Sequence, residues 1–587
     1  MDTRLDTTPE GDISQADHKL TNSGEQQLAS TLNIVIFVGL ALVALIPRIV
    51  LATQLDMVTD EVVYILGGKL YLPLLAHLSI GASGWMYNYE HPPFVKLLIG
   101  LVVLLNAALG HPLGELLAAR IPSMLMGTLL VVAIYWLGRA PFGRVVALLA
   151  ALCLAVSPWL VYFSALAYLD MTMTALITIA YLLLWHAIRR PWLYLVVALL
   201  VGLGADSKYT AVLAVPGIAL FTLYYFLAIR PRLPVEQRPS IPWRWWLAAI
   251  VLSLLAFVAF DPAIWPDPYH LLIHSFRYEW DHSINGHLTF IAGQYSLHVP
   301  HWAILYIILV KISAFVTVPA AFFAIFAVVQ LVRFHLRVPG VQATEAARLS
   351  FVVIWLIAIL AMFSLLNIVV GTHYHLPMAA PVAVAGACGL ATLLRYRRGQ
   401  LFASAPQQAT TLASSQSAFT GSALRINPRA AIVVAMLAIA LVGPHLFGLV
   451  TVHDAEGYTS EFFHDENAAL QVAYPGYRDA LQWLAAHTNG SAHVGLVALP
   501  GTLSSGSDGV SWYNYNSDLQ SLAHFQLAEA HPTDKTFAYD YLVWPMHLVQ
   551  RGYAIPEPWR SHVLHIVMGG NTIYCYILSR TPTTSSP

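Results

Sequence analysis

Charged residues are scarce in this sequence: Asp, Glu, Lys and Arg make up 10% of its 587 residues, where an ordinary soluble domain has about 25%. This deficit, together with a hydrophobic content of 58%, indicates an integral membrane protein. The net charge of -1 provides no electrostatic support for binding nucleic acid, so that class of partner is excluded. Cysteine is also rare, and Cys153, Cys388 and Cys575 lie too far apart to indicate a disulfide framework or a zinc cluster.

Apolar runs of membrane-spanning length recur along the chain, without the alternation typical of a β-barrel. We expect an α-helical polytopic membrane protein with about eleven transmembrane helices. The expected spans are 32–52, 117–138, 145–163, 171–188, 192–205, 209–228, 245–260, 302–332, 349–368, 375–394 and 430–451.

Arginines mark one side of the membrane. Five turns between spans are rich in arginine, and the positive-inside rule makes them cytoplasmic. They alternate correctly only if 94–110, which is apolar but short, lies along the interface. This topology puts the N-terminus inside and the loops 53–116 and 261–301 outside. The arginines are Arg139, Arg144, Arg189, Arg190, Arg230, Arg232, Arg238, Arg244, Arg333, Arg337, Arg348, Arg395, Arg397 and Arg398.

Composition divides the rest of the chain. Residues 1–30 are polar and acidic and predict a disordered cytoplasmic tail. The Ser/Ala/Thr/Gln-rich segment 399–429 predicts a flexible cytoplasmic linker before the last span, 430–452. Residues 453–587 have the composition of a soluble domain, which we expect to be α/β and extracytoplasmic. Its predicted helix is YRDALQWLAAHTNG, and its predicted strands are AHVGLVALP, FAYDYLVWP, HVLHIVM and NTIYCYILSR.

One short external stretch, residues 59–96, concentrates polar residues that the rest of the chain avoids. Asp60 and Glu61 stand where a helix should begin, and Glu90 and His91 precede a second helix that starts at a Pro-Pro pair. We expect Gly67 and Gly68 to end the first helix. The pattern predicts two short helices on the membrane surface that present carboxylates to a pocket at the lipid boundary.

Distant loops on the same face add further ionisable residues. Asp170 follows the third span, Lys208 lies between two short spans, and His373 and Tyr374 precede the tenth. Ionisable groups buried near a membrane face are functional candidates, because burying them is costly. A carboxylate can deprotonate an acceptor hydroxyl, and a lysine can stabilise a departing phosphate. These residue types indicate group transfer from a lipid-linked phosphate donor.

The motifs DExxY (Asp60, Glu61, Tyr64), YEHPPFVK, ALAYLD, SKYT and HYHLPMAAP resemble, in this order, the GT-C superfamily of glycosyltransferases. The likeness covers roughly residues 35–395 and is nearest to protein O-mannosyltransferases and their bacterial relatives, which include lipid A aminoarabinose transferases. It implies that residues 31–398 form a GT-C transmembrane catalytic module. Such enzymes take a sugar from a polyprenyl or dolichyl monophosphate on the outer face and invert the anomeric centre.

The resemblance also implies roles for single residues. Asp60 would be the general base with Glu61 beside it. Glu90 and His91 would line the donor phosphate or a metal position, and Lys208 would contact the phosphate. His373 and Tyr374 would also contact the donor, although His373 stands where the eukaryotic mannosyltransferases usually have arginine. Asp170 would shape the acceptor or metal side. Members of the family differ in metal dependence, so a divalent metal ion stays open and no other cofactor is expected.

The expected function is transfer of a sugar, with mannose favoured, to a hydroxyl group on protein, lipid or glycan by an enzyme of the plasma membrane. The alternatives are a transporter or flippase for a lipid-linked or sugar substrate, and an inactive scaffold of the same fold. Single residues also have simpler interpretations: Asp170 as a helix cap, Lys208 as a snorkelling side chain and Arg120 as an interface anchor. His270 and His274 have the i,i+4 spacing of helical metal ligands, but a loop that closes over the substrate explains them better.

Overall fold

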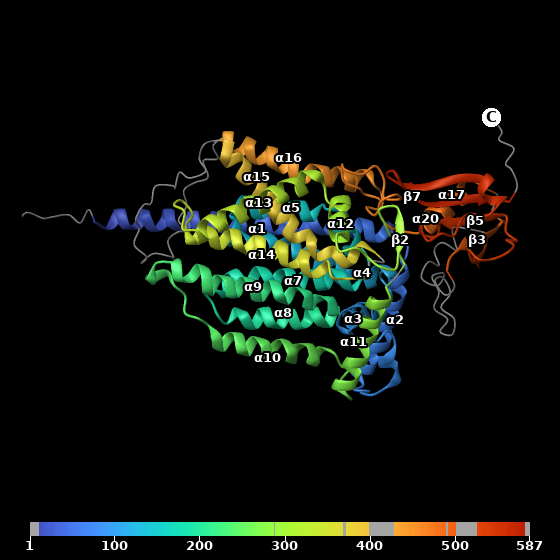
Figure 1. Ribbon diagram of the computed structural model, residues 1–587, viewed down its shortest axis with the longest axis horizontal. Helices are drawn as coiled ribbons and strands as arrows, with labels where there is room; N and C mark the ends of the chain where they lie inside the picture. Colours follow the sequence, from blue (N-terminus) through green and yellow to red (C-terminus); the bar gives the residue numbers. More distant parts are fainter. Residues whose placement is uncertain are drawn as a thin grey trace, which may run out of the picture.

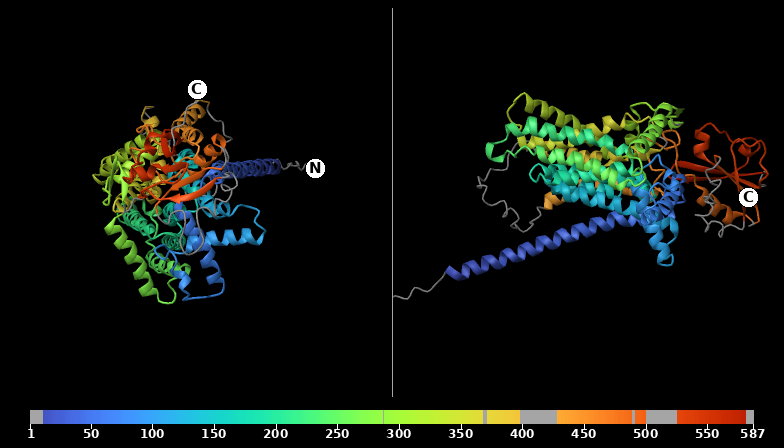
Figure 2. Two further views of the ribbon diagram at one scale, coloured as in Figure 1. Left: turned by 90° about the vertical axis from the view of Figure 1, so that its right-hand side faces the viewer. Right: turned by 90° about the horizontal axis from the view of Figure 1, so that it is seen from below.

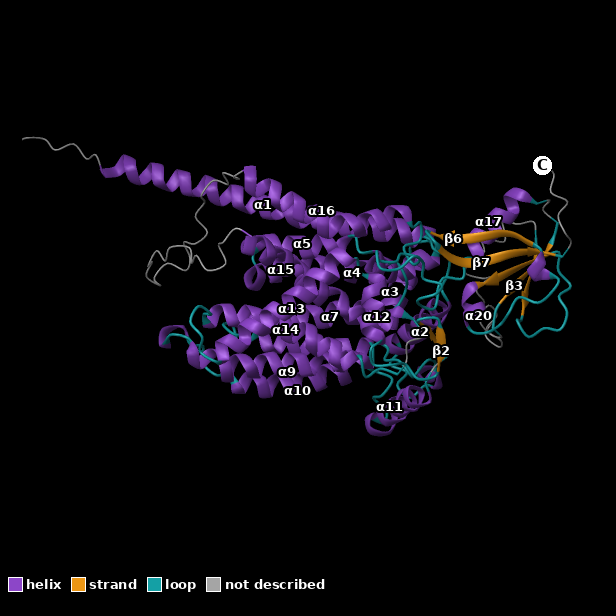
Figure 3. Cartoon of the chain, turned by 45° about the horizontal axis from the view of Figure 1, so that its top comes forward, coloured by secondary structure: helices purple, strands orange, loops and turns teal. Residues whose placement is uncertain are grey.

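The computed structural model of the chain describes residues 11–286, 288–367, 371–397, 428–488, 491–499 and 525–580. Its helices run side by side in one elongated bundle, and a small domain packs against one end (Figure 1). We call this end the domain end. The opposite end is the arginine end, because the last turns of α4 (Glu115–Phe142) and α13 (Ala314–His335) carry arginines there. Most strands gather in the small domain (Figure 3).

The helices of the bundle match the expected spans. Eight helices in the described part of the chain are long and apolar enough to cross a membrane, or nine if the bent pair α5 and α6 forms one span. Two further apolar helical segments are shorter, namely α8 and the part of α16 that spans Ala435–Thr451. The expected class, an α-helical polytopic membrane protein, is confirmed. Besides α4 and α13, the helices concerned are α1 (Gly11–Gln54), α5 (Arg144–Ala155), α6 (Pro158–Ser164), α7 (Leu169–Ala187), α8 (Leu193–Ser207), α9 (Val215–Tyr224), α10 (Trp243–Phe260), α14 (Ala343–Phe363), α15 (Ala379–Arg397) and α16 (Pro428–Thr451).

Burial ranks these helices from the centre of the bundle to its rim. In the apolar 18-residue stretch of α7, 83% is buried inside the structure, whereas in that of α10 the buried share is 6%. The apolar surface of α10 therefore faces outward, as expected of a helix that contacts lipid. The central position of α7 places Asp170, in its first turn, at the middle of the domain end.

One expected span is broken in the structure. The run 302–332 divides into α12 (Ala303–Lys311) and α13, with Ile312 in an extended conformation between them. Ser313 caps the second helix, since its hydroxyl accepts a hydrogen bond from the amide of Phe315 at 3.2 Å. The buried Lys311 pairs with Glu466 of the small domain at 2.6 Å. The break therefore serves to join the bundle to that domain.

The two polar segments on the arginine side differ in what the structure shows. Residues 11–30, expected to be part of a disordered tail, are helical and continue without interruption into the apolar span of α1. Once a helix has formed, each further residue that joins it adds one backbone hydrogen bond, so even a polar segment can continue it. Residues 1–10, and 398–427 of the expected linker, lie outside the described residues.

Two short helices lie across the domain end, α2 (Thr59–Ala76) and α3 (Phe94–Ala108), seen in blue in Figure 2. The expectation that Gly67 and Gly68 end the first helix is wrong, because α2 runs through both. A Cβ atom on Gly68 would lie 2.4 Å from the carbonyl oxygen of Lys96, and one on Gly100 would lie 2.2 Å from that of Gly68. The glycines thus let α2 and α3 cross in close contact.

The external loop after α10 contributes a third helix at this end, α11 (Pro268–Asn285), and a short hairpin of β1 (Thr289–Ile291) and β2 (Gln294–Ser296). An isolated bridge joins Ile291 to Leu470. The loop therefore connects the surface helices to the small domain.

The C-terminal domain is built on a five-stranded mixed sheet with the order β4-β3-β5-β7-β6. Strand β3 pairs in parallel with β4 and β5, while β7 pairs antiparallel with β5 and β6. The predicted helix and four predicted strands are present, and β4 is an addition. The elements are α17 (Tyr477–His487), β3 (His493–Val497), β4 (Gln526–Ala530), β5 (Tyr541–Pro545), α20 (Met546–Gln550), β6 (Val563–Gly569) and β7 (Thr572–Ser579).

Candidate functional site

The first turn of α2 supplies two acidic side chains that lie in different surroundings. Glu61 is completely buried and accepts a hydrogen bond from the amide of Val58 at 2.9 Å, which closes the start of the helix. Its other partners are the guanidinium of Arg120, at 2.8 and 2.7 Å, and the amide of Ala167 at 2.8 Å. With both oxygens occupied, Glu61 is suited to fixing the position of its neighbour Asp60.

Arg120 of α4 is equally buried, so the interpretation of this residue as an interface anchor is wrong. Its guanidinium donates to the carbonyl oxygens of Ala52, Leu55 and Asp56 at 2.8 to 3.0 Å, in addition to Glu61. These carbonyls belong to the end of α1 and the turn that follows. Arg120 therefore joins α1, α2 and α4 directly beneath the acidic pair.

Asp60 is half-buried at the domain end and faces the charges of more distant elements. Burial raises the pKa of its carboxyl group, while the Lys208 ammonium lowers that pKa and the Asp170 carboxylate raises it. The side chain of Tyr168 also lies near enough to lower the pKa. The structure thus brings Asp60, Asp170 and Lys208 together from three separate parts of the sequence.

Asp170 and Lys208 form a buried ion pair. The Lys208 ammonium donates to Oδ1 of Asp170 at 2.8 Å and lies 4.0 Å from the centre of the Tyr374 ring. Lys208 ends α8 in an extended conformation, which turns its side chain away from the helix it follows. Oδ2 of Asp170 has no hydrogen-bond partner among the described residues. An N–H or O–H group of a bound ligand would satisfy this oxygen by donating a hydrogen bond.

His373 and Tyr374 belong to a short 3₁₀ helix, Thr372–Met378, before α15. The ring of His373 lies 5.4 Å from that of Tyr168 and 5.5 Å from that of Phe163. Tyr168 in turn lies 5.9 Å from Tyr64 of α2. An aromatic wall therefore connects the His373 side of the site to the helix that carries Asp60.

Glu90 and His91 lie in the loop between α2 and α3, which is held by a buried lysine. The Lys96 ammonium donates to the carbonyl oxygens of Asn88 and His91 at 2.7 Å and to the side-chain oxygen of Asn88 at 2.9 Å. All three of its protons are thus used. The amide of Asn88 in turn donates to Glu90 at 2.5 Å. Lys96 therefore fixes the loop from below.

Glu279 of α11 completes this side of the site and was missed by the sequence analysis. Its carboxylate lies 3.4 Å from Nδ1 of His91. Burial raises its pKa to about 7, and Lys208 and Glu90 also influence that pKa, so Glu279 faces both groups of residues. Glu279 stands within the His-rich external loop, but no spacing in the sequence links it to Glu90 or His91.

The histidines of that loop have separate partners. His270 pairs with Asp267 at 2.7 Å, whereas the ring of His274 stacks on Tyr89 at 4.7 Å. Across the part of the chain that the structure describes, no group of three or more His, Cys, Asp or Glu side chains is arranged to hold a metal ion. In this arrangement the described residues of the site do not fit a metal ion. What α11 does is cover the Glu90 loop, where Ser275 donates to the carbonyl oxygen of Tyr89 at 3.0 Å.

The arrangement gathers eight candidate residues at one end of the bundle, in contrast to a path of charges through it. They include a half-buried carboxylate, an ion-paired lysine with an unpartnered carboxylate oxygen, and a histidine beside a second carboxylate. Such a site can remove a proton from a hydroxyl group and hold an anionic leaving group. The eight are Asp60, Glu61, Glu90, His91, Asp170, Lys208, His373 and Tyr374.

Comparison with known proteins finds a family match for part of the chain. Residues 90–261 match the sequence profile of a family described as dolichyl-phosphate-mannose-protein mannosyltransferase. The matched region contains Glu90, His91, Asp170 and Lys208. The resemblance found in the motifs is confirmed for this region. No curated protein sequence matches the chain.

Solved structures with a similar chain path include ArnT from Cupriavidus metallidurans bound to undecaprenyl phosphate. It has a TM-score of 0.44 and 16% sequence identity over 95% of this chain and 99% of that one. The Archaeoglobus fulgidus oligosaccharyltransferase tethered with an acceptor peptide has a TM-score of 0.42 and 13% identity. That alignment covers 84% of this chain and 64% of the oligosaccharyltransferase.

Proposed function

Because residues 90–261 carry the sequence signature of the dolichyl-phosphate-mannose-protein mannosyltransferase family, whose members are GT-C glycosyltransferases, we propose that this membrane protein is an inverting glycosyltransferase. It takes a sugar, with mannose favoured, from a polyprenyl or dolichyl monophosphate and transfers it to a hydroxyl on protein, lipid or glycan. The observation that carries the proposal is the meeting of Asp60, Asp170 and Lys208 at the domain end.

Asp60 is the general base in this proposal. Its carboxylate accepts the proton of the acceptor hydroxyl as the hydroxyl oxygen forms a bond with the anomeric carbon. Burial raises the pKa of Asp60, which makes its carboxylate a stronger base. Glu61 is a positioning residue, because its buried ion pair with Arg120 fixes the first turn of α2.

Lys208 and His91 stand on the leaving-group side. As the bond between the anomeric carbon and the phosphate oxygen breaks, the bonding pair stays on the phosphate, which leaves as the polyprenyl monophosphate. The Lys208 ammonium offsets the charge that develops there. His91, Glu90, His373 and Tyr374 contact the donor head group around it, and the prenyl tail remains in lipid beside the surface helices.

We assign Asp170 a second role, in ligand binding, in addition to its ion pair with Lys208. Its unpartnered oxygen Oδ2 is buried, so it favours a ligand that donates a hydrogen bond. We propose that Asp170 lies on the acceptor side, where a hydroxyl or amide of the acceptor donates a hydrogen bond to Oδ2.

The arginine end indicates how the protein is oriented in the membrane. If the positive-inside rule holds for its turns, the arginine end and the N-terminus are cytoplasmic and the site and the C-terminal domain are extracytoplasmic. This agrees with a donor that is used on the outer face of a plasma membrane. The transporter alternative has no comparable support, because the candidate residues meet at one end of the bundle.

The test is transfer of radiolabelled mannose from polyprenyl-phosphate-mannose to membrane acceptors by the purified full chain. We expect Asp60→Asn to lower the rate by about 10²- to 10⁴-fold, the usual contribution of a general base, with donor binding retained. Asp267→Asn is the matched control, since Asp267 is an exposed acid of the same end that pairs only with His270 in the described chain. Equal rates for wild type and Asp60→Asn would remove Asp60 from the mechanism. Absence of transfer with mannose and with other polyprenyl-linked sugars would contradict the proposed activity.

A further inference from the structure

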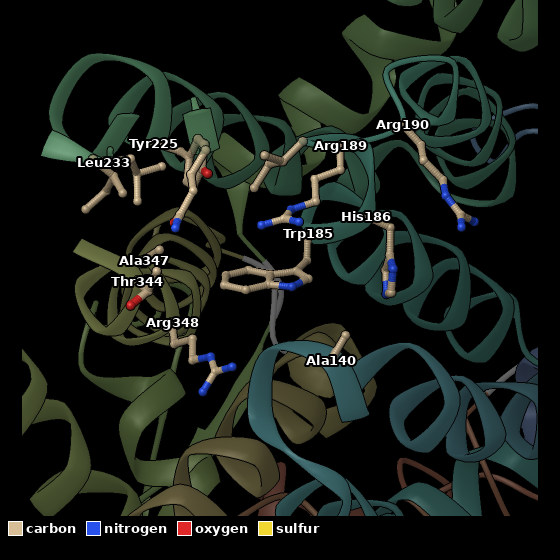
Figure 4. Close-up of a pocket in the computed structure, with 13 residues that line it drawn as sticks. Ala140, Trp185, His186, Arg189, Arg190, Tyr225, Leu233, Thr344, Ala347 and Arg348 are labelled. Carbon is tan, nitrogen blue, oxygen red and sulfur yellow. The ribbon is translucent and has the colours of Figure 1, made fainter. Parts of the chain in front are cut away.

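A cavity of about 430 Å³ opens at the arginine end, far from the candidate site. It lies between the end of α4, the turn after α7, the segment after α9 and the start of α14. Figure 4 shows the side chains of Arg189 and Arg190 on one side, that of Arg348 across from them, and the indole of Trp185 between. Gln237 and Thr344 add further hydrogen-bond donors. Among the described residues, no Asp or Glu lines this cavity.

The three arginines of the cavity differ from other arginines of the same end. Arg139 lies 3.9 Å from the centre of the Trp136 ring, and Arg230 and Arg232 donate to backbone carbonyl oxygens at 2.6 and 2.7 Å. In contrast, the guanidinium groups of Arg189, Arg190 and Arg348 are exposed and make no hydrogen bond or ion pair within the described residues. Three adjacent cations without a protein acceptor favour an anion.

An apolar cavity adjoins the first one. It measures about 650 Å³, and Thr344 and Arg348 line both. Its walls are mainly apolar and come from α4, α5, α13, α14 and α15, with Phe142, Phe323, Phe326 and Val352 among them. Its polar members are Gln342, Thr344, Glu345, Arg348 and Thr392. A ligand that fills both cavities has an anionic head and an apolar chain.

We propose that this pair of cavities binds an anionic phospholipid of the leaflet at the arginine end. The phosphate lies among Arg189, Arg190 and Arg348, and one acyl chain enters the cavity beyond Arg348. Basic pockets between transmembrane helices are suited to such head groups, because arginine binds phosphate through two parallel hydrogen bonds. A soluble phosphate compound would use the first cavity and leave the apolar one unfilled.

The test is native mass spectrometry of the purified full chain in detergent. The protein is offered an equimolar mixture of cardiolipin, phosphatidylglycerol, phosphatidylethanolamine and undecaprenyl phosphate. We expect the wild type to retain cardiolipin or phosphatidylglycerol. The variant Arg189→Gln/Arg190→Gln/Arg348→Gln loses on the order of a hundredfold in affinity, from three arginine contacts. These side chains have no structural partner, so the variant is expected to fold.

A matched variant removes the same charge from the same end. Arg144, Arg244 and Arg337 are exposed and line neither cavity, so Arg144→Gln/Arg244→Gln/Arg337→Gln should bind as the wild type does. Ala391→Phe fills the apolar cavity and should lower the binding of phosphatidylglycerol with long chains, but leave that of the dihexanoyl form unchanged. Equal loss in both triple variants would overturn the proposal. So would equal retention of phosphatidylethanolamine, or a preference for undecaprenyl phosphate that is lost in Arg189→Gln/Arg190→Gln/Arg348→Gln, because the polyprenyl donor proposed above binds at the domain end and should not depend on these arginines.

Discussion

The guanidinium of Arg120 binds both oxygens of Glu61, at 2.8 and 2.7 Å, although neither side chain is exposed. The same guanidinium holds the end of α1 through three carbonyl oxygens. The acid beside the candidate base is therefore part of the framework of the site. Its neighbour Asp60 remains half-buried and available for chemistry.

Breaking this pair from one side should destabilise the protein severely. Glu61→Gln leaves a buried guanidinium without its counter-charge, which costs about 3–5 kcal/mol. We expect a lower midpoint of thermal unfolding in detergent for Glu61→Gln and for Arg120→Met. The double variant Glu61→Gln/Arg120→Met should recover part of the loss, because no unpaired charge remains. Additive losses in the double variant would contradict the coupling.

Removing the Lys208 ammonium should shift the pH dependence of sugar transfer. Lys208 lowers the pKa of Asp60, so Lys208→Met should raise that pKa further. A base must be deprotonated to act, so the acid limb of kcat/KM moves to higher pH. The pH–rate profile measures the shift. Lys208→Arg should keep the wild-type limb, and Lys69→Met is the control because Lys69 is a half-buried lysine paired with Glu115. An unchanged limb in Lys208→Met would show that Lys208 does not act on the base.

Glu279 should make stability depend on pH in the weakly acidic range. Burial raises its pKa from 4.5 to about 7, so between these values the folded chain holds a proton that the unfolded chain has released. The free energy of unfolding therefore falls as the pH rises from 4.5 to 7 and is level above that. Thermal unfolding across this range should show a weaker fall for Glu279→Gln than for wild type. Glu236→Gln, at an exposed position, should leave the dependence of stability on pH as in the wild type. If Glu279→Gln also shows the wild-type dependence, this account is refuted.

The crossing of α2 and α3 should not tolerate a side chain at Gly68. A Cβ atom there would lie 2.4 Å from the carbonyl oxygen of Lys96 and 2.6 Å from the amide of Gly100, and backbone atoms cannot yield as side chains do. Gly68→Ala should cost about 1–3 kcal/mol and lower sugar transfer, because Lys96, whose backbone the new Cβ atom would displace, holds the Glu90 loop. Gly114→Ala meets no atom within 4 Å and should be neutral. Thermal unfolding and transfer assays check both variants.

The sequence predicted the helices of the bundle well because lipid demands long apolar runs, and these are visible without any knowledge of packing. The grouping of Asp60, Asp170 and Lys208 also followed, since the arginine turns assigned all three to one face. Strand β4, QLAEA, was missed because it has none of the β-branched or aromatic residues that are typical of strands.

The remaining differences depend on contacts between distant residues. The partner of Arg120 stands 59 positions away, so a lone arginine at the start of a span looked like an anchor. Gly67 and Gly68 suggested a helix end, because their use in a close crossing is visible only when Gly100 is beside them. Glu279 joined the site because α11 lies against the Glu90 loop, and no local pattern carries that information.

The C-terminal domain contacts the bundle at the turn that leads into α2 and at the end of α12. Asp56 accepts a hydrogen bond from the amide of Arg478 at 3.3 Å, and Lys311 pairs with Glu466 at 2.6 Å. A chimera that takes this domain from another chain must therefore also bring the partners of Asp56 and Lys311. Without them, the graft would leave a buried lysine uncompensated and loosen the turn four residues before Asp60.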